Sequence, residues 1–143
     1  MIFNVADHIE QIKAGTKTQT RRSSDRYQED KLYAVQPGRG KKGIPEGKIF
    51  INFKIREYKP DLGDLPEDAV FERRWREADA GYPIRDWSAE AEGGYTVDEY
   101  EALYEAMHPG WTERWCYHFT YFTVEELIEC GAVKPKKETL SDD

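Results

Sequence analysis

The sequence predicts an α+β fold, a small and mostly antiparallel β-barrel decorated by helices. Segments typical of strands lie near residues 18–22, 32–36, 48–58 and 115–122. They are too few and too irregularly spaced for repeated βαβ units. At 143 residues the chain has the size of one domain with a substantial core. Its aromatic content of 13% indicates that Trp, Tyr and Phe form much of that core.

The first helix is predicted over residues 6–14, where apolar residues recur at spacings of three and four. Asn4 or Asp7 is expected to cap its start, and Gly15 is placed to end it in the left-handed conformation. The residues that follow Gly15 therefore leave a helix C-terminus and enter the first strand.

Three later helix starts carry capping signals. Asp64 and Pro66 open a helix that is expected to reach Glu72, and capping boxes begin at Thr96 and Thr123. The stretch 77–95 is rich in Gly, Ala, Asp and Glu, and we expect it to be mostly loop.

Two strands have clear patterns. The segment Lys48–Tyr58 alternates between apolar and largely polar residues, which predicts one buried face. The residues expected on that face are Ile49, Ile51, Phe53 and Ile55. The segment Trp115–Phe122 is aromatic at both parities, which predicts a strand buried on both sides.

The domain is expected to span residues 1–123, with a C-terminal helix packed on it at 124–133 and a charged, disordered tail at 134–143. Cys116 and Cys130 have no CxxC spacing and no neighbouring histidine cluster. We therefore expect a cytoplasmic protein with free thiols, no metal site and no cofactor. No apolar run approaches membrane-spanning length, and the first residues lack the basic start of a signal peptide.

The charge is divided unevenly along the chain. Residues 1–60 contain 13 Lys and Arg against 7 Asp and Glu, whereas residues 61–143 contain 8 against 21. This asymmetry predicts one electropositive working surface on a protein whose net charge is −7. A specific nucleotide or a structured RNA suits such a protein better than general coating of a duplex.

Two cationic segments are candidates for that surface. The sequence Gly15-Thr16-Lys17-Thr18-Gln19-Thr20-Arg21-Arg22 follows the first helix, and residues 38–43 form a glycine-rich loop. The residues expected to bind nucleic acid are Lys17, Arg21, Arg22, Arg39, Lys41 and Lys42. Two simpler interpretations stay open, a solvated basic strand for the first segment and a flexible surface hairpin for the second. The loop is not a P-loop, because it lacks the Gly-Lys-Ser/Thr ending and the helix after it.

The order of these motifs resembles the ASCH family, whose fold is like the PUA RNA-binding barrel. The resemblance covers about residues 1–123 and depends most on Gly15–Arg22, followed by Tyr33-Ala34-Val35-Gln36-Pro37-Gly38, the long alternating strand, the helix that reaches Glu72 and the aromatic strand from Trp115. It implies binding of RNA or a nucleotide in a cleft lined by the Lys-Thr motif.

One bacterial branch of that family is an amidohydrolase that removes the acetyl group from N4-acetylcytidine. The resemblance places its lysine on Lys17, its nucleophilic threonine on Thr20 and its glutamate on Glu72. A threonine hydroxyl needs a neighbouring base, and Lys17 can be that base if its pKa falls toward about 7–8. Residues three apart in a strand point to opposite faces, so Lys17 must lie in the turn before the strand, or a bulge must intervene.

Three functions therefore stay open. The first is an RNA- or nucleotide-binding module that uses both cationic segments, and the second is an amidohydrolase with Lys17, Thr20 and Glu72 in the catalytic site. The third is a protein-interaction module that uses the acidic second half of the chain.

Overall fold

The computed structural model describes residues 1–58 and 84–134. In chain order the elements are α1 (Ala6–Ala14), β1 (Gln19–Arg22), β2 (Leu32–Ala34), β3 (Gly47–Tyr58), α4 (Asp86–Gly93), α5 (Val97–Met107), β4 (Glu113–Thr123) and α6 (Val124–Glu129). The helix predicted to reach Glu72 and the last nine residues of the predicted tail lie outside the described residues.

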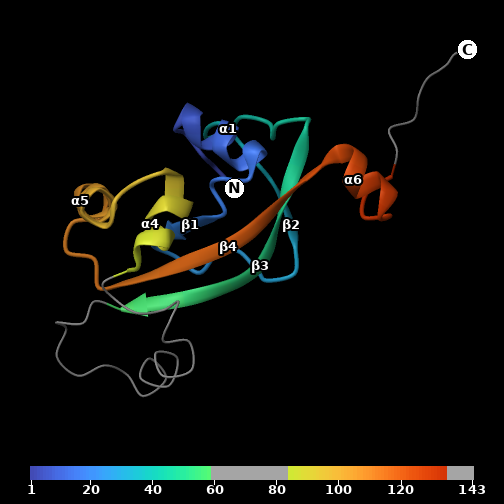
Figure 1. Cartoon of the computed structure of the whole chain (residues 1–143). Coiled ribbons are helices and arrows are strands. Elements are labelled where there is room, and N and C mark those ends of the chain that lie inside the picture. Colours follow the sequence, from blue (N-terminus) through green and yellow to red (C-terminus); the bar gives the residue numbers. More distant parts are fainter. Residues whose placement is uncertain (59–83, 135–143) are drawn as a thin grey trace, which may run out of the picture.

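The four strands form one open sheet with the order β1-β4-β3-β2, and all neighbouring pairs are antiparallel. The predicted α+β class with antiparallel strands is confirmed. Figure 1 shows α4 and α5 at the end of the sheet where β4 begins, and α6 at the opposite end. No helix in the two described stretches is long and apolar enough to cross a membrane.

The first helix has the predicted bounds and the predicted end. Gly15 has φ 80° and its N–H bonds back to the last turn, which is the left-handed cap that glycine adopts without strain. The predicted N-cap, Asn4 or Asp7, is wrong, because Val5 occupies the N-cap position and no side chain caps the helix.

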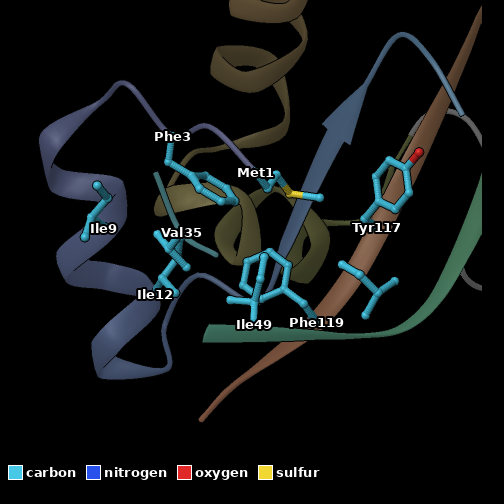
Figure 2. Packing of buried hydrophobic residues seen from close by; sticks show 9 residues of the cluster. Met1, Phe3, Ile9, Ile12, Val35, Ile49, Tyr117 and Phe119 are labelled. Atoms are coloured by element: carbon cyan, nitrogen blue, oxygen red, sulfur yellow. The ribbon is translucent and has the colours of Figure 1, made fainter. Parts of the chain in front are cut away.

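The larger hydrophobic core lies between α1, the first three residues and one face of the sheet. Ile9 and Ile12 of α1 belong to this core with Phe3, Val35 and Ile49, and Figure 2 shows the last three between α1 and the sheet. A second, smaller cluster joins α4 to α5 and contains Ala89, Tyr100, Tyr104 and Trp111, together with Ile84. The sheet therefore has different partners on its two sides.

At a β-bulge in β3, the buried residues of the strand change from one face of the sheet to the other. Ile51 pairs with Phe119, but the next pair joins Phe53 to His118, so Asn52 is the extra residue. The parity of the strand changes there, and Phe53 is 36% exposed instead of buried as the alternation predicts. Ile49 and Ile51 face the larger core, whereas Ile55 and Glu57 lie opposite Cys116 and Arg114 on the other side.

The strand β4 lies between β1 and β3 in the sheet. Cys116, Tyr117 and Phe119 are buried, in agreement with the prediction of burial on both sides, but Thr120 is exposed. Burial on both sides therefore holds only for the middle of the strand.

The prediction of a loop over 77–95 is wrong for Asp86–Gly93, which forms α4. Half of its residues are Ala or Glu, which have good intrinsic helix propensity, and it ends at Gly94 with φ 85°. The capping boxes at Thr96 and Thr123 are both confirmed, with reciprocal bonds to Glu99 and Glu126.

Candidate functional site

The Gly15–Arg22 motif joins α1 to β1, an edge strand of the sheet. Lys17 lies in the turn before β1 begins at Gln19, so the parity of the strand does not separate it from Thr20. A position of Lys17 in this turn is one of the two arrangements that would let the side chains of Lys17 and Thr20 share a site. Among the described residues, however, no direct hydrogen bond joins them, and Thr20 Oγ1 accepts one from Arg22 Nε at 3.2 Å.

The side chain of Lys17 is inside the protein, with 2% of the residue exposed. Its Nζ donates to the backbone carbonyl oxygens of Gln19, at 3.0 Å, and of Glu92. The carboxylate oxygen Oε1 of Glu92 lies 3.7 Å away. Burial lowers the pKa of Lys17 below its ordinary value, Arg22 and Arg21 act in the same direction, and Glu92 opposes them.

Glu92 comes from α4 and is equally buried, at 2% exposed. Burial alone would raise the pKa of its carboxyl, but Lys17 and Arg21 bring the pKa below its ordinary value. The side chain is therefore an ionised carboxylate beside a lysine whose charge is disfavoured by burial.

Arg21 is not free to bind an external anion. It is 5% exposed, and it forms a two-point contact with Glu57 at 2.8 and 3.0 Å. It also donates to Glu92 Oε2 at 2.8 Å and to Ser88 Oγ at 2.7 Å. Its planar, pre-organised guanidinium suits this internal role, which differs from the predicted contact with nucleic acid.

The same carboxylates extend the network to α5. Glu57 also accepts from Arg114 Nε at 2.7 Å, and Arg114 binds Glu101 through two bonds of 2.8 Å. We call the basic groups of Lys17, Arg21 and Arg114 and the carboxylates of Glu57, Glu92 and Glu101 the internal charge network. Its hydrogen bonds and its pairing of carboxylates with guanidinium groups offset the cost of burying ions.

Arg22 points to the side opposite Arg21. Its Nη2 donates to the backbone oxygen of Ile2 at 2.6 Å, and its guanidinium carbon lies 5.0 Å from the centre of the Phe3 ring. Lys17 Nζ lies 5.9 Å from the centre of the same ring. Phe3 therefore borders both Lys17 and Arg22, and Arg22 in turn contacts Thr20.

The second cationic segment stays at the surface. Arg39, Lys41 and Lys42 are exposed. Gln36, which precedes their loop, pairs in parallel with the N-terminal segment through Phe3 N to Gln36 O at 2.7 Å and Gln36 N to Met1 O at 2.8 Å. The base of the loop is thus next to Phe3, although its three cations contact neither Lys17 nor Thr20 in any described interaction.

The predicted carboxylate, Glu72, lies outside the described residues, and the sequence analysis did not identify Glu92. Glu92 was missed because the stretch 77–95 was predicted to be mostly loop, whereas Glu92 lies in α4. A run of helix formers that ends at Gly93-Gly94, with glutamates at alternate positions, was the available signal. Its pairing with Lys17, 75 residues away in sequence, has no local signature.

Within the described residues no group of three or more His, Cys, Asp or Glu could hold a metal ion. Cys116 is buried, Cys130 is exposed, and both are free thiols. Comparison with protein-family models, with curated proteins and with solved structures found no match.

Proposed function

We propose that this protein is an ASCH-like amidohydrolase that removes an acyl group from a modified cytidine. Thr20 is the nucleophile, Lys17 is its base, and Glu92 takes the role that the sequence analysis assigned to Glu72. The observation that carries the proposal is the buried contact between Lys17 and the ionised Glu92, 3.7 Å apart, together with Phe3, whose ring borders both Lys17 and the Arg22 that donates to Thr20.

The surroundings of Lys17 suit a base better than a contact for RNA phosphates. A neutral amine has two hydrogens, which the carbonyl oxygens of Gln19 and Glu92 accept, and its lone pair stays available for a proton. Burial favours that neutral form by lowering the pKa of Lys17, and the Glu92 carboxylate opposes this decrease. A phosphate, in contrast, would need an exposed ammonium.

In the proposed reaction the Thr20 oxygen attacks the acyl carbon, and Lys17 takes the hydroxyl proton. The carbon–nitrogen bond then breaks, and the exocyclic amine of the cytosine ring leaves with a proton returned by Lys17. Water hydrolyses the resulting ester on Thr20 to a carboxylic acid. Arg22, which donates to Thr20 Oγ1, is placed to stabilise negative charge that develops near this oxygen.

The position of the N-terminal segment supports a PUA-like arrangement within this proposal. On one side, residues 1–3 bond to Ala34, the last residue of β2, and to Gln36 just after it. On the other side they bond to Arg22 of β1. Since β1 and β2 are the two edges of the sheet, a segment that contacts both edges curls the sheet toward a barrel.

The test is incubation with N4-acetylcytidine and related acylated nucleosides, read by mass spectrometry. We expect deacylation by the wild type, and a loss of at least about 100-fold in kcat for Thr20→Ala and for Lys17→Ala. The matched control is Thr18→Ala, which removes an exposed threonine from the same motif and should retain activity. Activity that survives Thr20→Ala would rule out the covalent mechanism.

A second candidate function is binding of RNA or a nucleotide without catalysis. The exposed cations of residues 38–43, held next to Phe3 by the bridge at Gln36, favour it. Replacing Arg39, Lys41 and Lys42 together by Ala should then weaken RNA binding and reduce its dependence on salt by about three charges. An unchanged salt dependence would exclude these residues as phosphate contacts.

A further inference from the structure

A small polar cavity lies just beyond the end of β1. It has a volume of about 220 Å³ and is lined by Arg22, Ser23, Ser24, Arg26, Tyr27 and His108. The cavity is smaller than the ~300 Å³ at which pockets for whole drug-sized ligands begin. It can therefore hold one group of a ligand, not a complete nucleotide.

The nitrogen groups around this cavity have capacity left to bind a ligand. Arg22 uses Nε and Nη2 inside the protein, and its Nη1 donates no hydrogen bond among the described residues. The side chain of Arg26 is exposed and has no described partner, and the His108 ring makes no described hydrogen bond. This distinguishes the cavity from Lys17 and Arg21, whose donors are directed into the protein.

The wall that carries Arg26 is fixed in advance by the central strand of the sheet. Tyr117 Oη donates to the Ser24 carbonyl at 2.9 Å and accepts from the backbone N–H groups of Arg26 and Tyr27 at 3.0 and 3.3 Å. One hydroxyl group thus holds the whole turn. The nearby carboxylate of Asp25 is paired with Lys54 at 2.5 Å, so it does not neutralise the cavity.

We infer that this cavity binds a terminal phosphate monoester, so that the substrate is a nucleotide or the phosphorylated end of an RNA instead of a bare nucleoside. Two guanidinium groups and a ring nitrogen can supply several hydrogen bonds to phosphate oxygens. Arg22 links this cavity to Thr20, because it lines the first and bonds to the second. The assignment of the phosphate to a substrate rests on the proposed function, whereas phosphate binding itself does not.

The test compares ligands that differ only in the phosphate. By calorimetric titration we expect cytidine 5′-monophosphate to bind about tenfold or more tightly than cytidine, which is the effect of one strong charge-assisted contact. Arg26→Ala should bring the ratio close to one, and Arg26→Lys should restore it in part. The control is Lys48→Ala, which removes an exposed cation of β3 that does not line the cavity and should leave the ratio unchanged.

A second pair of ligands separates the two sources of the phosphate. A short RNA with a 5′-phosphate is compared with the same RNA carrying a 5′-hydroxyl. If the phosphate increases the affinity of the RNA more than that of the mononucleotide, the site binds an RNA end. If it increases the affinity less, the site binds a free nucleotide. The inference is overturned if cytidine monophosphate binds no better than cytidine, if it does not bind at millimolar concentration, or if Arg26→Ala keeps the preference.

These outcomes are distinct from failure of the proposed function. Deacylation of N4-acetylcytidine with no preference for its 5′-phosphate would overturn the phosphate site and leave the hydrolase. A phosphate preference that depends on Arg26, without turnover of any acylated substrate, would support the phosphate site and overturn the proposed hydrolase activity.

Discussion

At the scale of single residues, Lys17 and Glu92 illustrate how burial changes the role of a charge. Both are 2% exposed, and each modifies the protonation of the other. Within the proposed mechanism Lys17 acts in its neutral form, so activity should rise with pH through the pKa of Lys17.

Glu92→Gln should therefore shift the pH–rate profile in a defined direction. The carboxylate raises the pKa of Lys17, so its removal lowers that pKa and moves the rising limb of kcat/KM to lower pH. Glu90→Gln is the matched control, because Glu90 is an exposed residue of the same helix. A limb that stays in place or moves to higher pH would contradict the role of Glu92.

His8 should make the folded state sensitive to acid. Burial, assisted by Lys17, lowers the pKa of His8 from 6.5 to about 4, and its Nε2 lies 2.9 Å from Tyr95 Oη. The unfolded chain then binds a proton that the folded chain does not, so stability is complete above about pH 6.5 and declines as pH falls toward 4. His8→Gln should flatten this part of the curve of unfolding free energy against pH; an identical slope in both proteins would show that other groups cause it.

At the scale of elements, the internal charge network connects strands of the sheet to α4 and α5. Glu57 of β3 accepts hydrogen bonds from Arg21 of β1 and Arg114 of β4, and Arg114 continues to Glu101 of α5. Glu57 therefore joins three strands, and Arg114 links them to α5.

Glu57→Ala should destabilise the protein by about 3–5 kcal/mol, because it removes a buried carboxylate and the hydrogen bonds that two buried guanidinium groups, those of Arg21 and Arg114, donate to it. Chemical denaturation measures the change. Glu46→Ala is the control, since this exposed glutamate lies 3.9 Å from Lys13 and a surface pair contributes about 0–1 kcal/mol. Equal losses in the two variants would show that the network does not stabilise the fold.

The elements also show what could be predicted from the sequence. The starts of α5 and α6 were predictable, because a capping box places its whole signal within four residues. The motif Gly15–Arg22 was correctly placed after a helix. The partners of Lys17 and Arg21 were not predictable, because Glu92 and Glu57 lie far away in sequence and are selected by tertiary packing.

At the scale of the whole molecule, the sheet separates an apolar side from a charged one. The larger core contains Met1, Phe3 and the isoleucines of α1, whereas the internal charge network occupies the side of α4 and α5. The excess of positive charge in residues 1–60 is therefore partly internal, and only part of it remains for a ligand. The sequence predicted the asymmetry but not this division, because composition does not report burial.

The bulge at Asn52 allows one strand to serve both of these sides. Deleting Asn52 would make Ile51 and Phe53 neighbours in a regular ladder and leave Ile55 and Glu57 opposite Cys116 and Arg114. We therefore expect the deletion variant to keep cooperative thermal unfolding, and we expect Asn52→Ala, which removes only the bond to Thr120, to lower the melting temperature by a few degrees at most. Loss of cooperative unfolding on deletion would contradict this role of Asn52; otherwise natural variants of this protein should differ here in the number of residues as well as in the residue they carry.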